Sequence, residues 1–309
     1  MSPTIETVAV AGATGLMGTP ILSALLASNF NVTVLTRQDS TAATFPSNVK
    51  VIRVDYSSHS SLVSALKGID AVVSALTHLA IATSESALID AAVEAGVKRF
   101  LPSEYASDTT NPVAATFPLF ASKVASTKKL EALAGANPGF TWTSVVTGPL
   151  LGWIATQAFF NPKEKTAKLY DRGGREFSVA MREVVGKAVV GVLAHAGETK
   201  NRVVKVHAAT TTLKKLWGYE QMVLGEEGWT VETPSVEDSL ASAWAAVESG
   251  KFDFPTIFGF IVAASQGEGY GRLLEGTDNE LLGIPTLSEE EVQQFVEKVV
   301  CGDGSPAGW

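Results

Sequence analysis

The sequence is poor in cysteine, in clustered positive charge and in long apolar runs, and each shortage excludes a class of protein. One cysteine among 309 residues, Cys301, excludes an intramolecular disulfide. Lysine and arginine number 24 against 32 acidic residues, with no basic cluster larger than a pair, which argues against a nucleic-acid partner. Residues 1–6 hold no basic-then-apolar leader and no apolar run could span a bilayer, so we expect a cytoplasmic protein without a membrane partner.

Short apolar runs alternate with helical segments along the first half of the chain. The runs at residues 7–11, 31–36, 50–55, 70–76, 97–101 and 140–146 are rich in β-branched residues, as in strands buried on both faces. This alternation is typical of a parallel, doubly wound α/β sheet. We therefore predict a Rossmann-type nucleotide-binding domain over residues 1–150. A smaller C-terminal substrate-binding subdomain is expected over residues 151–309, with some segments packing back on the first domain.

Three glycines directly follow the first expected strand. Gly12, Gly15 and Gly18 have the spacing G-x-x-G-x-x-G, and a helix follows them. In this context the first glycine permits a sharp turn, the second permits close approach of a pyrophosphate, and the third permits close packing of helix and strand. The helix N-terminus offers N–H groups and a partial positive charge to phosphate oxygens. The motif therefore predicts a dinucleotide site.

The end of the second strand indicates which dinucleotide is bound. An acidic residue there would bind the adenosine ribose, but the strand ends in Arg37, whose planar guanidinium suits a 2′-phosphate. This favours NADP(H) over NAD, although Asp39 lies close by. Asp55 follows the third strand, where an adenine would lie, and Leu76 ends the fourth strand at the edge where ligands collect. We expect no metal.

One lysine lies on the apolar side of a helix expected over residues 118–135. At about 100° per residue, Lys123 shares the sheet-facing side of this helix, whereas Lys128 and Lys129 point away. A buried lysine is costly unless it has a partner or a task, which makes Lys123 a candidate catalytic residue. A lysine whose stem covers the surface while its charge reaches water remains an equal alternative. His78, after the fourth strand, is a second candidate for moving a proton.

The pattern changes after residue 150, where bulky apolar side chains gather. They suit the lining of a substrate pocket, although ordinary core packing explains them nearly as well. The candidate substrate-binding residues are Tyr105, Leu151, Trp153, Phe159, Phe160 and Phe258.

Several segments together resemble one known family. They are GATGLMG at residues 12–18, the strand that ends in Arg37, GVKRFLPSEY at 96–105, the segment 120–132 that contains Lys123, FSVAMREVVGKAVVGVL at 177–193 and ETKNRVV at 198–204. In this order they resemble the isoflavone reductase-like, NmrA-like branch of atypical short-chain dehydrogenases over nearly the whole chain. The Y-x-x-x-K pair of better-known short-chain dehydrogenases is absent, because Tyr105 is followed by Ala-Ser-Asp-Thr.

The resemblance implies an NADPH-dependent reductase in which Lys123 is catalytic. It implies that Arg37 meets the 2′-phosphate. In many relatives a lysine several residues further along also clamps this phosphate, but residues 38–48 contain none, so we expect a weaker preference for NADP than is usual in the family. The implied pyrophosphate contacts are Gly12, Thr14, Gly15, Leu16, Met17 and Gly18, and the implied nicotinamide contacts are Thr147, Gly148 and Pro149. A small, apolar, aromatic or enone-type natural product is the expected substrate, and a monomer or homodimer the expected assembly. A non-catalytic redox sensor and a non-redox cyclase or isomerase are the alternatives.

Overall fold

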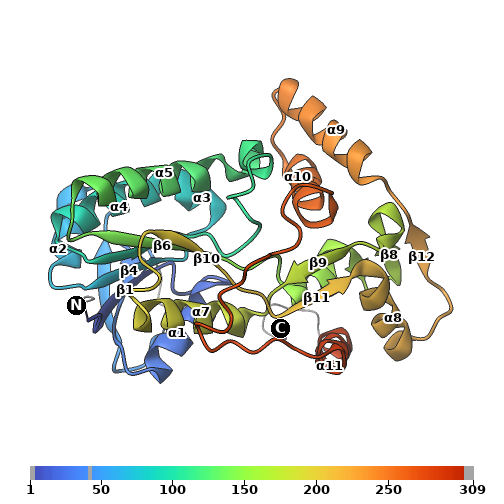
Figure 1. Cartoon of the computed structure of the whole chain (residues 1–309), viewed down its shortest axis with the longest axis horizontal. Helices are drawn as coiled ribbons and strands as arrows, with labels where there is room; N and C mark the ends of the chain where they lie inside the picture. Colours follow the sequence, from blue (N-terminus) through green and yellow to red (C-terminus); the bar gives the residue numbers. More distant parts are fainter. Residues whose placement is uncertain (1–3, 41–43, 303–309) are drawn as a thin grey trace.

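The computed structural model of the chain describes residues 4–40 and 44–302 and contains a seven-stranded sheet at its centre (Figure 1). All pairs of neighbouring strands in this sheet are parallel, and the spatial order is β10-β6-β5-β4-β1-β2-β3. The strands β2 and β3 extend the sheet on one side of β1, whereas β4, β5, β6 and β10 extend it on the other side, which is the arrangement of a doubly wound fold. The strands are β1 (Thr7–Ala11), β2 (Asn31–Arg37), β3 (Lys50–Val54), β4 (Ala71–Ser74), β5 (Arg99–Leu101), β6 (Thr141–Val146) and β10 (Arg202–Lys205).

Helices cover both faces of this sheet. One face carries α1 (Gly18–Ala27) and α7 (Arg182–Ala194), and the other carries α2 (His59–Leu66), α4 (Ser86–Glu94) and α5 (Ala121–Ala136) (Figure 1). Each face has its own hydrophobic cluster, and β4 is buried along its whole length. This double burial explains why the central strands are continuous apolar runs rather than alternating ones.

The second half of the chain contributes to the sheet and also forms a separate lobe. β10 and α7 lie beyond residue 150, yet β10 pairs with β6 and α7 packs against α1. The two-domain division therefore stays a prediction, with these two segments belonging to the sheet layers. The other elements beyond residue 150 lie to one side (Figure 1); they are α6 (Leu151–Trp153), β7 (Phe160–Asn161), β8 (Thr166–Lys168), β9 (Glu176–Val179), β11 (Ala209–Thr212), α8 (Leu213–Leu224), β12 (Thr230–Glu232), α9 (Val236–Glu248), α10 (Phe254–Gln266) and α11 (Glu289–Cys301).

Several helix boundaries differ from the predicted ones. The segment Pro118–Phe120 forms a 3-10 turn, and α5 begins only at Ala121. The short helix α3 (His78–Ala80) and a π-helical turn, Ile81–Glu85, precede α4. Lys128 is exposed as predicted, but Lys129 is not free in solvent, because its ammonium lies 2.6 Å from Asp90 on α4. No helix within the described residues is both long enough and apolar enough to cross a membrane.

Candidate functional site

The carboxyl ends of the parallel strands meet at one edge of the sheet, and a crevice opens there. Its volume is about 290 Å³, and its lining includes Gly12–Gly15, Arg37, Tyr56 and Leu76. These residues lie at or just beyond the carboxyl ends of β1, β2, β3 and β4, so the strand order itself brings them together. The crevice lies where a doubly wound sheet binds its ligand, beside the point at which strand order reverses.

The segment Gly12–Gly18, called the glycine turn below, contains glycines at which any other residue would be too large for the close backbone contacts. Gly12 has φ +81°, and a Cβ there would lie 2.4 Å from the carbonyl oxygen of Ala75. A Cβ on Gly18 would lie 2.0 Å from the carbonyl oxygen of Gly12. Within the described residues no side chain caps the N-terminus of α1. The N–H of Thr19 bonds to the carbonyl of Gly15 at 3.0 Å and Pro20 has no N–H, which leaves the N–H of Gly18 in this first turn for an anion.

Arg37 lines the crevice, and together with Asp55 it also lines a neighbouring hollow. The side chain of Arg37 is 75% exposed, and its Nε is 3.7 Å from the equally exposed Asp39. Asp55 accepts hydrogen bonds from the hydroxyl and the backbone N–H of Ser57, at 2.6 and 2.9 Å, which lower its pKa. Asp55 therefore shapes the loop after β3, while the guanidinium of Arg37 is open to solvent apart from its contact with Asp39.

A second cavity, of about 340 Å³, adjoins the crevice at Leu76. Its wall is mostly apolar, and the glycine turn, the 3-10 turn and α10 contribute to it. Its lining comprises Leu16, Met17, Leu76, His78, Ile81, Ser103, Glu104, Tyr105, Ala106, Ser107, Leu119, Phe120, Lys123, Gly148, Pro149, Leu150, Trp153 and Ile261. Most of the residues predicted for the pyrophosphate, the nicotinamide and the proton transfer thus line two neighbouring hollows, whereas Gly18 and Thr147 line neither.

Lys123 contributes the ammonium group of the second cavity. Its side chain is 13% exposed, and its Nζ donates a hydrogen bond to the backbone carbonyl of Glu104. The Nζ also lies 3.9 Å from Oε1 of Glu104. His78 faces the same cavity, and burial, together with the charge of Lys123, lowers its pKa. The imidazole is therefore neutral at pH 7, and Lys123 supplies the positive charge.

The predicted substrate-binding residues divide into three groups. Tyr105 and Trp153 line the second cavity. Leu151, Phe159 and Phe160 are buried in the hydrophobic core instead, because the chain after residue 150 turns them away from the cavity. Phe258 is half-buried next to Trp153, with ring centroids 6.3 Å apart.

The remaining predicted cofactor residues support the turns. Gly148 has φ +73°, and a Cβ there would lie 2.6 Å from the carbonyl oxygen of Ser178. Thr147 is fully buried, and its hydroxyl bonds to the carbonyl of Gly148 at 3.0 Å. Thr147 therefore stabilises the turn after β6, whereas Gly148 and Pro149 form the cavity wall.

Sequence reasoning missed the carboxylates behind the cavity. Glu85, which is fully buried, accepts hydrogen bonds from the N–H of Ser103 at 2.9 Å and the hydroxyl of Ser126 at 2.6 Å. It thereby ties the loop after β5 to α5, one turn beyond Lys123. The motif that contains Glu104 was visible in the sequence, but no periodicity indicated that its side chain turns inward.

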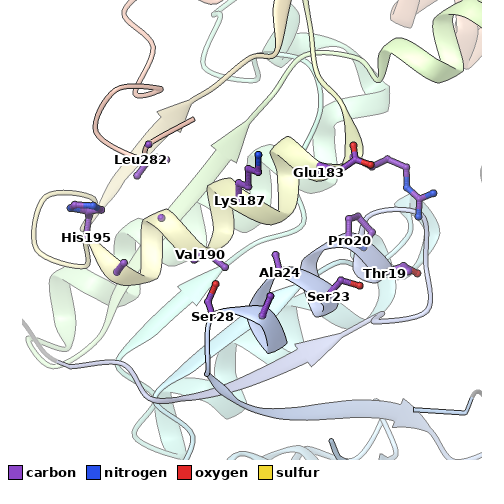
Figure 2. Close-up of a pocket in the computed structure, with 15 residues that line it drawn as sticks. Thr19, Pro20, Ser23, Ala24, Ser28, Glu183, Lys187, Val190, His195 and Leu282 are labelled. Atoms are coloured by element: carbon purple, nitrogen blue, oxygen red, sulfur yellow. The ribbon is translucent and has the colours of Figure 1, made fainter. Parts of the chain in front are cut away.

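A larger hollow of about 730 Å³ lies away from this site, between α1 and α7 (Figure 2). Pro20 and Ala24 on α1 and Lys187 and Val190 on α7 contribute to its lining (Figure 2). It contains neither the glycine turn nor Lys123, so size alone does not identify the chemical site. Within the described residues no group of three or more histidine, cysteine or acidic side chains could hold a metal ion.

Comparison with known proteins identifies the relatives of this chain. The model of the NmrA-like family matches residues 4–234. The chain belongs to the NmrA-like family. The oxidoreductase poxI of Penicillium oxalicum is 34% identical over 300 residues, covering 91% of each chain. The oxidoreductase aprR of Aspergillus flavus is 33% identical over 292 residues, covering 92% of this chain and 96% of that protein.

A solved structure has the same fold as this chain. The leucoanthocyanidin reductase of Vitis vinifera, in a binary complex with NADPH, superimposes with a TM-score of 0.74. The alignment covers 96% of this chain and 100% of that one at 18% sequence identity. At this identity the likeness establishes the shared fold.

Proposed function

We propose that this protein is an NADPH-dependent reductase that acts on a small, largely apolar molecule carrying a carbonyl or a conjugated alkene. The observation that carries the proposal is the position of Lys123, whose shielded ammonium group lines an apolar cavity that adjoins the glycine-turn crevice at Leu76. The names of the fungal relatives and the NADPH of the grape neighbour support it.

The residues of the crevice fit a dinucleotide. The uncapped N-terminus of α1 and the glycine turn would hold the pyrophosphate, and Arg37 would meet a 2′-phosphate. Gly148 and Pro149 would lie beside the nicotinamide, because they border the cavity that contains Lys123. When bound, the cofactor supplies the hydride.

Lys123 would supply the proton that accompanies this hydride. Its Nζ would donate to the oxyanion formed from a carbonyl, or to the carbanion formed from an alkene. The apolar wall excludes water, which strengthens the attraction between the ammonium and the developing negative charge. His78, neutral at pH 7, would accept or relay a hydrogen bond at the same wall. Trp153 and Tyr105 would contact the substrate.

The test is a titration with NADPH and NADH, followed by NADPH oxidation with a panel of aromatic ketones, quinones and enones. We expect tighter binding of NADPH and turnover that falls about 10²-fold or more in Lys123→Ala. Lys128→Ala, an exposed change on the same helix, should leave turnover intact. Undiminished turnover in Lys123→Ala would contradict the role of Lys123. Binding without oxidation of any substrate would instead favour a sensor or a non-redox enzyme.

A further inference from the structure

Two different oxygens of one residue approach the ammonium group of Lys123. The backbone carbonyl of Glu104 accepts its hydrogen bond, and Oε1 of Glu104 lies 3.9 Å from Nζ. Lys123 is on α5, whereas Glu104 is in the loop that follows β5, so tertiary structure creates the pair. A single residue thus offers both a neutral and a charged acceptor to the same cation.

The carboxyl group of Glu104 is buried and makes few other contacts with polar groups. Its side chain is 1% exposed, and Oε1 has no hydrogen-bond partner among the described residues. Burial raises the pKa of Glu104, against the opposing effect of the Lys123 charge and a hydrogen bond from Thr109. A buried carboxylate is destabilising without a nearby cation, and Lys123 supplies that cation.

The other acidic groups around Glu104 already have partners. Glu85, from the π-helical turn, is bonded to Ser103 and Ser126. Asp108, from the same loop as Glu104, lies 2.6 Å from the ammonium of Lys205. The negative charges of Glu85 and Asp108 both act to raise the pKa of Glu104. His78, on α3, lies close enough to Lys123 for the lysine charge to lower the pKa of the imidazole. Glu104 is therefore the carboxylate in this group that is left to pair with Lys123.

The backbone next to Glu104 is held in an unfavourable conformation. Tyr105 has φ +34°, a region that a bulky L-residue rarely adopts. The N–H of Tyr105 bonds to the carbonyl of Val145 at 2.9 Å, which fixes this turn to β6. Strain of this kind persists where the surrounding structure enforces it, commonly at functional sites. Here it accompanies a carbonyl aimed at the amine of Lys123.

We propose that Glu104 is the positioning residue for Lys123, and that its backbone carbonyl and buried carboxylate together keep the ammonium group charged and in place at the cavity wall. The inference rests on the proposed function, in which Lys123 donates the proton. Glu85 supports the arrangement from behind, because it fixes the loop of Glu104 and α5 to each other through Ser103 and Ser126.

The first test follows the charge of Lys123 without requiring turnover. Protein labelled with 13C and 15N lysine is titrated by NMR as wild type and as Glu104→Gln, which keeps the shape of the side chain. We expect the titration midpoint of Lys123 to fall by about one pH unit or more once the paired anion is lost. Glu131→Gln, an exposed change on α5, should leave it unmoved. An unchanged midpoint in Glu104→Gln overturns the inference.

The reciprocal experiment covers the case in which Glu104→Gln does not fold. In protein labelled with 13C glutamate, Lys123→Met should raise the titration midpoint of the Glu104 carboxyl group, because its cation is gone. A carboxyl signal that does not respond to Lys123→Met overturns the inference.

Kinetics separate this inference from the proposed function. On any substrate that the wild type reduces, Glu104→Gln should lower kcat about tenfold at alkaline pH and move the basic limb of the pH profile down, with KM for NADPH unchanged. A basic limb that stays in place would contradict the inference. If neither protein oxidises NADPH while the coupled NMR shifts are present, the reductase proposal fails and the pairing of Glu104 with Lys123 stands.

Discussion

Glu220 is a carboxyl group with no evident partner in the described part of the chain. It lies on α8, is fully buried, and neither of its oxygens accepts a hydrogen bond from any described residue. Burial raises its pKa to about 9. The folded protein must therefore keep this side chain protonated at neutral pH, whereas the unfolded chain ionises it near pH 4.5.

We expect Glu220→Met to stabilise the protein by about 2 kcal/mol at pH 7. Because the pKa of Glu220 is raised in the folded state, burial of this side chain does not destabilise the wild type below pH 4.5. The wild type loses stability as the pH rises from about 5 to 9. Urea unfolding at pH 5, 7 and 9 should show this loss in the wild type and a flatter dependence in the variant. Glu226→Met, an exposed change just after α8, is the control and should keep the wild-type slope.

At the residue scale, the sequence predicted Lys123 but not what holds it. Helical periodicity placed Lys123 on the sheet-facing side, because that information is local to one helix. Glu104 and Glu85 come from a loop and from a π-helical turn, and their contacts cross 19 and 41 residues of sequence. Likewise, composition alone could not separate Trp153, which lines the cavity, from Phe159 and Phe160, which lie in the core.

At the scale of secondary-structure elements, the contact between α1 and α7 depends on one residue without a side chain. A Cβ on Gly186 of α7 would lie 2.5 Å from the carbonyl oxygen of Pro20 and 2.9 Å from Cβ of Ala24. The two helices can therefore pack this closely only while position 186 is glycine. By contrast, a Cβ on Gly135 near the end of α5 would meet nothing within 4 Å.

These two glycines predict opposite outcomes for the same substitution. Gly186→Ala should destabilise the protein by about 1–3 kcal/mol, because α7 must move away from α1. Gly135→Ala should stabilise it by about 0.5–1 kcal/mol, because alanine restricts the unfolded chain and favours the helix. Thermal and urea unfolding of both variants measure the difference. Equal effects in the two variants would show that the helices adjust to an added methyl group.

The predicted strands were more accurate than the predicted helix ends. Strands buried on both faces have a distinct composition, so the first two are found within one residue of their predicted ends. The start of α5 was placed three residues early, since proline opens a 3-10 turn as readily as an α-helix. That β10 would lie beside β6 could not be predicted, because pairing between distant strands leaves no periodic signal.

At the scale of the whole molecule, Asp70 joins three segments at the amino-terminal edge of the sheet. Its carboxylate accepts hydrogen bonds from the backbone N–H groups of Glu6 and Thr7 at 3.0 and 2.9 Å, and from Lys98 at 2.6 Å. Burial alone would raise its pKa, but these bonds hold the pKa well below its ordinary value of 3.8. The start of β1, the start of β4 and the turn before β5 are thus fixed by one charge.

Asp70→Asn should therefore lower the free energy of unfolding by about 2 kcal/mol at pH 7. Since the folded pKa is depressed, this stabilisation is present above the unfolded pKa and is lost as the pH falls below about 4. The wild type should lose stability between pH 5 and 2, and Asp70→Asn should lose less. Equilibrium unfolding across this range, with the exposed Asp39→Asn as control, measures the effect. Parallel curves for wild type and Asp70→Asn would contradict the assignment.

The late position of α7 and β10 in the chain has a consequence for biosynthesis. Because α7 covers α1, and β10 completes the sheet beside β6, the nucleotide-binding half cannot bury its apolar faces while only its own residues have left the ribosome. A nascent chain stalled near residue 150 would expose the side of α1 that packs against α7 and an unpaired edge of β6. We expect such truncated chains to aggregate or to require a chaperone, and the two halves to be inseparable as expression fragments.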